Sequence, residues 1–383
     1  MRGYFVEFAA REGGELEGPR ELESRAAIER DVENLRGALR WAIDAGDADL
    51  ALTEVEALAT AGALRTPPFG LIALEAAQMP GAEGHDLRPM ALGAVCMTYT
   101  QQGEVERAVS FAHAALEAAR EWGDSPRTRK LRCRLNGCVF AALAYGSDTD
   151  RILTLGRAAL EDASAIDDPV EKLRALVLLS SMLDAAHSDE AIGYGEEALA
   201  QAKAIGNPSY LAWAPMMLGG RLATTDPARA RRLLDEAARA AAAADNEFAR
   251  SMAMQQLAMT QARQADHFAA AQTLLEMVRH AHRAGDHGTV MSGLADVACL
   301  LAVLGVDEPA LVTGEWVMDH GIVITDALAS NDLWAQFGIV AFLASREGAP
   351  RGARERSADL ARSFDEAAII DYVEAQLGAH GPS

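Results

Sequence analysis

The sequence predicts an all-α fold, a right-handed α-α superhelix (solenoid) built from about seven to eight stacked helical hairpins. Half of the 383 residues are hydrophobic but only 5% are aromatic, and alanine and leucine, which favour helices, occur throughout. The alternation of polar and apolar residues that is typical of strands is nearly absent. Helix stop signals recur at a nearly constant spacing, so we expect one repeat array in place of several separate domains.

The stop signals define the length of the repeat. They are Gly, Asp or Asn residues that follow apolar helical runs. Equivalent stops fall at Gly46, Gly84, Gly123, Asp167, Gly206, Asp245 and Gly285, with successive spacings of 38 to 44 residues. A length of about 40 residues accommodates two helices of four or more turns and two short links, because a helix rises about 1.5 Å per residue.

One hairpin carries the pattern of a tetratricopeptide repeat (TPR). Its large, small, aromatic, turn and small positions are Val95, Cys96, Tyr99, Gly103 and Ala108. Two later hairpins match in part and lack the aromatic residue. The array therefore resembles degenerate, elongated TPRs.

Helix starts agree with this register. Asp226 supplies a cap and Pro227 the first helical position, while Ser188 precedes two acidic residues in a first turn. Pro215 falls within a predicted helix, where it removes a backbone donor and is expected to bend the helix.

The pattern loosens after Gly285. Residues 322–328 are ambiguous, and residues 333–345 are predicted to form a helix. A Gly, Pro and Arg-rich link over residues 346–354 then precedes a single amphipathic helix over about residues 356–377. We expect N-terminal helices over residues 1–60, TPR-like repeats over 61–345, and a capping helix with its tail over 346–383.

The segment from Asp31 to Asp47 contains Asn-Leu-Arg-Gly-Ala-Leu-Arg-Trp-Ala, followed by Gly-Asp. It resembles the start of the TPR region in bacterial signal-transduction ATPase (STAND) regulators, which include LuxR-type and SARP-type transcriptional regulators and adenylate cyclase-linked ATPases. The resemblance covers about residues 1–60 and is only architectural beyond them. The residues alone predict a buried helix face, since Leu35, Leu39 and Ala42 recur at helical spacing.

The resemblance implies a sensor and scaffold function, with the output delivered by other domains. No ATPase core precedes Met1 and no helix-turn-helix closes the C-terminus, so we expect a detached sensor half. A truncated fragment of a larger ATP-binding regulator remains the alternative. None of the three lysines follows a glycine, as a phosphate-binding loop requires, so no nucleotide or other cofactor is expected.

Charge restricts the classes of partner. The net charge of -21 repels nucleic-acid phosphates and anionic lipid. No apolar run has the roughly 20 residues needed to span a bilayer, and acidic residues follow the N-terminus too soon for a signal peptide. We therefore expect a cytoplasmic protein that binds a protein, a peptide or a small effector, with homo-oligomerisation left open.

Cysteine and histidine spacing gives little support for a metal site. Cys133 and Cys138 lie five residues apart and would point in different directions on one helix. His280, His282 and His287 gather at a helix end, where cationic side chains are favourable. A metal site there is the weaker alternative.

No local catalytic motif is present, so the chain is expected not to be an enzyme; an enzyme site assembled only by the fold is the alternative. In a TPR-like stack the first helix of each hairpin lines a concave groove. Registering the repeats places a mixed set of side chains there: Met90, Met97, Arg134, Ser180, Gln256, Thr260, Arg263 and Ser292. Arg134 and Arg263 are the candidates to bind a carboxylate, and structural ion pairing is the alternative for both.

Overall fold

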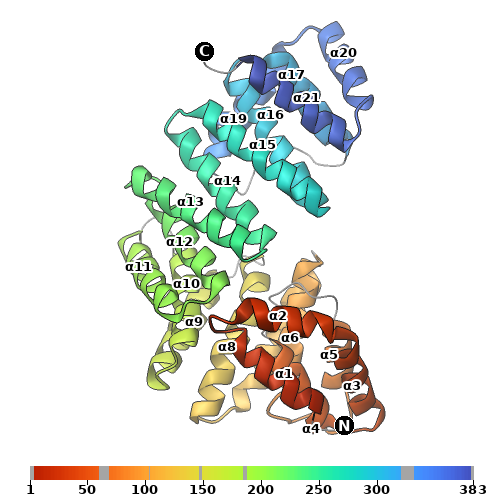
Figure 1. Ribbon diagram of the computed structural model, residues 1–383, viewed down its shortest axis with the longest axis vertical. Helices are drawn as coiled ribbons and strands as arrows, with labels where there is room; N and C mark the ends of the chain where they lie inside the picture. Colours follow the sequence, from red (N-terminus) through yellow and green to blue (C-terminus); the bar gives the residue numbers. More distant parts are fainter. Residues whose placement is uncertain are drawn as a thin grey trace. The chain divides into compact units, whose positions relative to one another are not determined.

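The computed structural model describes residues 4–59, 69–102, 104–145, 149–183, 188–320 and 332–380. Every regular element in these ranges is a helix, which confirms the predicted all-α class (Figure 1). The chain divides into two compact units, Met1–Met217 and Leu218–Ser383. The division falls inside α12 (Pro208–Leu222). It therefore lies within the predicted repeat region, and the three predicted segments stay a prediction.

The first unit begins with four helices, α1 (Tyr4–Glu15), α2 (Glu21–Arg30), α3 (Val32–Asp44) and α4 (Ala48–Ala59). Helix α1 packs on α4. Phe8, Leu16 and Ile28 form a small apolar cluster with residues of α3 and α4. Leu35, Leu39 and Ala42 are fully buried, which confirms the helix face predicted from their spacing.

The repeats of the first unit follow as pairs of helices. They are α5 (Phe69–Ala77), α6 (Arg88–Gln101), α7 (Val105–Ala118) with the short 3-10 helix η2 (Ala119–Glu121), α8 (Pro126–Tyr145), α9 (Thr149–Ala165), α10 (Pro169–Met182) and α11 (Ser188–Ile205). Helices α6, α8 and α10 each pack on the helix that follows them, and they also pack on one another in chain order. These first helices of successive hairpins form the inner layer of a TPR-like stack.

The second unit continues the pattern. Its helices are α13 (Pro227–Ala243), α14 (Glu247–Arg263), α15 (His267–Ala284), α16 (His287–Val303), α17 (Asp307–Asp319), α19 (Asp332–Gly348), α20 (Arg351–Arg362) and α21 (Glu366–His380). Helix α16 packs on α15, α17 and α19. It buries apolar side chains on most of its surface, from Val290 to Leu301. The core of this unit is therefore centred on α16.

Six of the seven predicted stops coincide with left-handed backbone, and Gly123 does not. Gly46, Gly84, Gly206 and Gly285 have φ between 70° and 75°, and Asp167 and Asp245 have φ of 52° and 51°. A residue in this conformation ends a helix because it turns the chain away from the helical path. Glycine adopts it without steric cost, and Asp tolerates it better than most residues.

The predicted helix starts are also observed. The Asp226 carboxylate accepts a hydrogen bond from the amide of Arg229, with Pro227 in the first turn. Helix α11 begins at Ser188. Helix α12 continues through Pro215. The ambiguous residues 322–328 lie outside the described ranges.

The C-terminal prediction of one long helix after a nine-residue link is wrong. The chain forms two helices there, α20 and α21, and only residues 349–350 separate α19 from α20. The break has a local cause: the Asp365 carboxylate accepts from the amide of Ala368 and caps α21. The carbonyl of Phe364 accepts a hydrogen bond from the Trp316 indole, which fixes the turn on α17.

Candidate functional site

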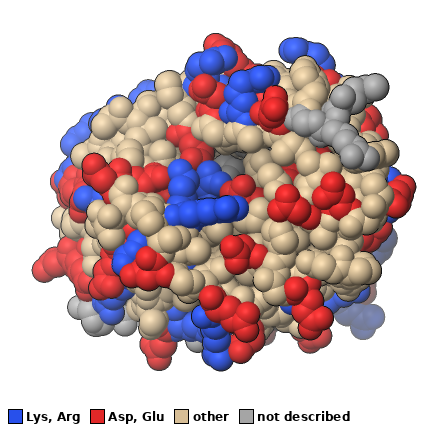
Figure 2. All heavy atoms as spheres, turned by 90° about the horizontal axis from the view of Figure 1, so that it is seen from below, with Lys and Arg blue, Asp and Glu red and all other residues tan. Residues whose placement is uncertain are grey.

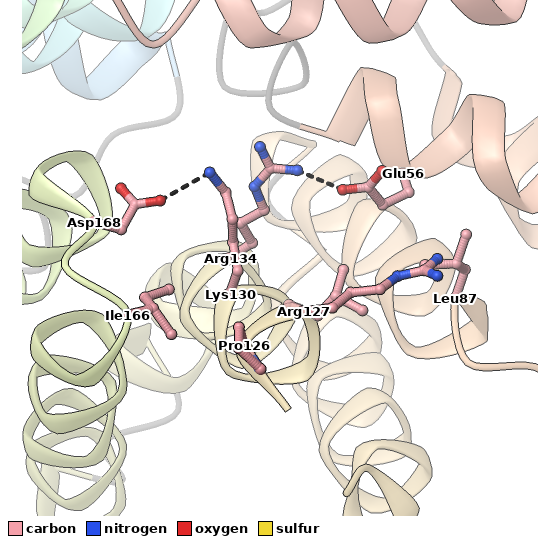
Figure 3. A pocket seen from close by; sticks show the side chains of 9 residues that line it. Glu56, Leu87, Pro126, Arg127, Lys130, Arg134, Ile166 and Asp168 are labelled. Atoms are coloured by element: carbon pink, nitrogen blue, oxygen red, sulfur yellow. Dashed lines mark hydrogen bonds and ion pairs between the residues drawn. The ribbon is translucent and has the colours of Figure 1, made fainter. Parts of the chain in front are cut away.

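A pocket of about 370 Å³ opens beside the first two turns of α8 in the first unit (Figure 3). It lies between the end of α4, the start of α6, α8 and the link from α9 to α10. Its lining residues are Glu56, Leu87, Pro126, Arg127, Lys130, Leu131, Arg134, Ile166 and Asp168. Three of them are cationic and two are acidic, so the pocket is polar and suited to a charged group.

The three cations of the pocket differ in their partners. The Lys130 ammonium donates to the Asp168 carboxylate at 2.8 Å, and the Arg134 guanidinium donates to Glu56. The Arg127 side chain extends away from both pairs, toward Leu87. It is exposed and makes no hydrogen bond or ion pair within the described part of the chain. Arg127 is therefore the donor most available to a ligand.

Helix α8 begins with a dense basic run, since Arg127, Arg129, Lys130, Arg132 and Arg134 fall within its first nine residues. Cations near a helix N-terminus face the positive end of the helix dipole and do not stabilise the helix there. One face of the molecule carries both acidic and basic side chains (Figure 2). A basic run in a chain of net charge -21 therefore marks this helix as unusual.

A buried ion cluster adjoins the pocket and consists of Glu17, Arg134, Glu171 and Arg174. The Glu17 Oε1 atom accepts from Arg134 Nη2 at 3.1 Å and from Arg174 Nη2 at 3.0 Å. Glu171 Oε1 accepts from Arg174 Nη1 at 2.8 Å and lies 3.5 Å from Arg134 Nε. Arg174 Nε also donates to the Tyr210 hydroxyl at 2.7 Å. Two guanidiniums from α8 and α10 thus converge on one carboxylate from the N-terminal segment.

Burial controls the charge states in this cluster. It raises the pKa of Glu171, whose side chain is fully buried, although Arg174 opposes the shift. Burial also disfavours charged Arg134, but Glu17, Glu56 and Glu171 together raise the pKa of that guanidinium. For Arg174, burial is outweighed by Tyr210, Glu171 and Glu17, and the pKa of the guanidinium lies well above the usual range. Both arginines therefore stay charged and need carboxylate partners.

The segment that carries Glu17 makes further polar contacts with the inner layer. We call residues 16–21, which join α1 to α2, the Glu17 turn. The Asn207 amide donates to the carbonyls of Leu16 and Gly18, at 2.9 and 3.1 Å. Glu21 accepts from the backbone amide of Ser209 at 2.8 Å and from the Ser209 hydroxyl. The turn is thus held by side chains and amides of α8, α10 and the start of α12.

The structure separates the predicted groove residues into buried and accessible ones. Met90, Ser180 and Thr260 are buried, with Ser180 donating to the carbonyl of Ala191 and Thr260 to that of Gln256. Met97, Gln256 and Ser292 are partly buried, and Arg263 is exposed. Arg134 is ion-paired, which is the alternative that the sequence left open for it. The fully buried positions do not face a ligand, and the remaining assignments stay predictions.

The four cysteines are all buried and unoxidised, and burial raises the pKa of Cys133 to about 12. The His280 and His282 side chains diverge: His280 contacts Arg250 and Arg283, whereas His282 and His287 contact Glu366 at the start of α21. Across the described residues, no group of three or more His, Cys, Asp or Glu side chains is arranged to hold a metal ion. Nor is any described helix both long and apolar enough to cross a membrane.

Sequence reasoning found Arg134 but missed most of its surroundings. Glu17, Arg174 and Asn207 were not predicted, and neither was the exposed Arg127. The basic run at the start of α8 was visible in the sequence and could have identified Arg127 and Lys130. No sequence signal joins Glu17 to Arg174, which lie 157 residues apart.

Comparison with known proteins identifies the fold. No family model and no curated protein matches the sequence. A Rap protein solved in complex with competence and sporulation factor superposes with a TM-score of 0.58 at 14% identity, over 98% of this chain and 99% of that one. A STAND protein with a tetratricopeptide repeat sensor, from Pyrococcus horikoshii, gives 0.57 at 14% identity. That match covers 94% of this chain but 55% of the STAND protein. The predicted TPR-like solenoid is confirmed, and the chain shares its fold with the part of the STAND protein that it matches.

Proposed function

We propose that this TPR-like array is the binding module of a regulatory protein and that its pocket beside α8 takes a carboxylate-bearing segment of a protein or peptide. The observation that carries the proposal is Arg127, an exposed guanidinium with no partner among the described residues, in the lining of a pocket that also holds Lys130 and Arg134. A guanidinium presents a planar fork of donors that matches a carboxylate. The pocket thus offers positively charged side chains to an acidic ligand, in a chain whose net charge is negative.

The structural neighbours support the regulatory part of the proposal. One is a STAND protein in which the TPR region is named as the sensor, and the other is a Rap protein bound to a factor. By analogy, ligand binding here would be passed to an ATPase or a transcriptional output. The site favours binding over catalysis, because both pocket carboxylates are ion-paired and the lining includes neither His nor Cys.

The test is a binding screen with the full-length chain. Twelve-residue peptides that carry from zero to three Glu or Asp residues are titrated against the wild type and the Arg127→Ala/Lys130→Ala variant. We expect affinity to rise with the number of carboxylates, to fall with added salt and to drop about tenfold or more in the variant. The matched control is Arg107→Ala/Arg120→Ala, which removes two exposed cations elsewhere in the unit.

The control decides what the screen means. A loss of peptide affinity in Arg127→Ala/Lys130→Ala, without a loss in the control variant, supports the proposed site. Equal loss in both variants would show nonspecific attraction to cations and would contradict it, as would affinity that does not depend on the carboxylates.

A further inference from the structure

We propose that the Glu17 turn covers a binding surface of the first unit, and that an acidic segment of a partner binds there by displacing the turn. We call this surface, which is formed by α8, α10 and the start of α12, the inner face. This inference rests on the proposed function and specifies both the ligand chemistry and its regulation. The partner segment would present a glutamate or aspartate side chain flanked by free backbone carbonyls. The contacts of the turn itself define that chemistry.

The first step concerns the inner face as a receptor. Arg134 Nη2 and Arg174 Nη2 lie 3.1 and 3.0 Å from the same oxygen of Glu17. Their other donors contact Glu56, Glu171 and Tyr210, which belong to the repeats and their flanking helix α4. With Glu17 removed, two positive and two negative charges remain, and the two Nη2 groups point at an empty carboxylate position. The receptor is therefore complete without the turn.

The second step concerns recognition of the backbone. The Asn207 amide donates to the carbonyls of Leu16 and Gly18 on either side of Glu17. Its Oδ1 atom accepts from the amide of Tyr210 at 2.9 Å and fixes the side chain at the start of α12. A side chain oriented in this way can donate to any segment that has carbonyls beside an acidic residue. Specificity for the turn is consequently low, and a partner segment can replace it.

The third step concerns how the turn is attached. Helix α1 is held to α4 by apolar packing, with Gly13 directly against the backbone of Ala57. The contacts of the turn with α8, α10 and α12 are instead hydrogen bonds and ion pairs. A polar interface of this kind exchanges its partners more readily than an apolar core. The turn can therefore leave the inner face while α1 keeps its packing on α4.

Occupation by the turn lowers the apparent affinity for a partner. The apparent dissociation constant is the intrinsic one divided by the fraction of molecules in which the face is free. A partner that binds also releases the Glu17 turn from α8, α10 and the start of α12. Binding on the inner face is thereby converted into a movement of this turn.

The probe for the test is an end-blocked, fluorescein-labelled peptide with the sequence of residues 14–22, Gly-Glu-Leu-Glu-Gly-Pro-Arg-Glu-Leu. Its anisotropy is measured with the full-length wild type and the Glu17→Gln variant, after circular dichroism has shown equal helicity. We expect the variant to bind about tenfold or more tightly, because its own turn competes less well. Glu23→Gln, at an exposed glutamate that contacts only Arg20, is the matched control and should bind as the wild type does.

Two further arms locate the binding. Asn207→Asp keeps the oxygen that caps α12 and loses the amide donor. The double variant Glu17→Gln/Asn207→Asp should therefore lose the tighter peptide binding that is expected of Glu17→Gln. A peptide with Gln in the position of Glu17 should bind at least about tenfold more weakly to every form. Equal affinity of wild type and Glu17→Gln for the labelled peptide would overturn the inference.

Hydrogen exchange of the wild type provides a test that needs no variant. Saturating peptide should speed exchange at the amides of residues 16–21, and unchanged exchange at saturation would refute displacement. If the acidic peptides of the screen bind wild type and Glu17→Gln equally through Arg127 and Lys130, the displaceable turn is wrong and the proposed function stands. If no acidic peptide binds either form, both proposals fail.

Discussion

One buried site in each unit shows two opposite ways of holding ionisable groups. The first unit gathers Glu17, Glu171, Arg134 and Arg174 into one cluster in which each charge has an opposite neighbour. The second unit buries Asp296 on α16 with a single hydrogen bond, from Gln255 Nε2 at 3.1 Å. Burial raises the pKa of Asp296 to about 7. Burial also raises the pKa of Glu171, but Arg174 and Arg134 lie beside that carboxylate and oppose the shift. The two sites therefore differ in whether a buried acid has cationic neighbours.

This difference bears on function. A paired cluster holds its donors and acceptors in fixed directions and suits recognition of another charged group. A buried acid without a cationic partner makes the stability of its unit depend on pH. The following predictions either break the pairing in the first unit or remove the unpaired charge in the second.

The largest effect is expected from Arg174→Met. The substitution leaves fully buried Glu171 with only the 3.5 Å contact to Arg134 and leaves Tyr210 without its donor. Breaking a buried pair from one side typically costs about 3 to 5 kcal/mol of unfolding free energy. Urea unfolding followed by circular dichroism measures the loss.

The control for this prediction restores the balance of charge. Arg174→Met/Glu171→Leu removes both partners and should regain much of the stability, because apolar replacement of a buried pair is often neutral. Arg107→Met, at an exposed pair with Glu104, should cost less than about 1 kcal/mol. A loss for Arg174→Met no larger than that of the exposed control would mean that the cluster is not tightly coupled.

The next effect concerns Asp296→Asn in the second unit. An acid whose folded pKa is raised contributes its full stability below its unfolded pKa and loses it as pH rises to the folded value. The stability of the wild-type second unit should therefore fall between about pH 4 and pH 7, by roughly 3 kcal/mol for this group. In the Asp296→Asn variant, this contribution to the unfolding free energy should not change over this range, and the variant should be more stable than the wild type at pH 8. Thermal unfolding at pH 4 and pH 8 tests this, and a variant with the wild-type pH profile would contradict it.

The fold was largely predictable from local patterns. The stops at Gly46, Gly206, Gly285 and Asp245 depend on backbone geometry that each residue imposes on its own turn. The C-terminal error has another origin. The break between α20 and α21 combines the local Asp365 cap with a hydrogen bond from Trp316 to Phe364, 48 residues away. The pattern over residues 356–377 does not contain this second contact.

The candidate site was predictable only in part. Repeat register placed Arg134 on the inner helix face, but the same register included Ser180 and Thr260, which are buried. Periodicity gives the direction of a side chain and not the depth to which its neighbours cover it. The ion cluster joins residues 117 and 157 positions apart, so only the tertiary fold brings them together.

A smaller effect distinguishes two matched caps, Asp168-Pro169 in the first unit and Asp226-Pro227 in the second. Asp226 accepts one backbone amide at its helix start, whereas Asp168 accepts two backbone amides and the Lys130 ammonium. We expect Asp168→Ala to cost about 2 kcal/mol and Asp226→Ala about 1 kcal/mol. Urea unfolding of both variants measures the difference, and equal costs would show that the additional contacts of Asp168 add nothing to the cap.

The pH dependence of this cap runs opposite to that of Asp296. Burial acts to raise the pKa of Asp168, but Lys130 and the amides of α10 outweigh it, so the pKa is lowered. Its stabilisation is therefore complete above the unfolded pKa of about 4 and is lost as pH falls below that value. Asp168→Asn, which keeps a cap acceptor, should remove this loss at low pH in thermal unfolding. If the variant still loses stability at low pH, acids other than Asp168 cause that loss.

The smallest effect on stability is expected from two exposed arginines, one in each unit. Arg127 and Arg263 make no hydrogen bond or ion pair to the described residues, so alanine at either position should change the unfolding free energy by less than about 0.5 kcal/mol. Their effects on binding should differ, because only Arg127 lies in a pocket with two further cations. Titration of an acidic peptide should therefore show weaker binding for Arg127→Ala and unchanged binding for Arg263→Ala. The reverse result would move the carboxylate site to the second unit, where repeat register alone had placed Arg263 on the groove.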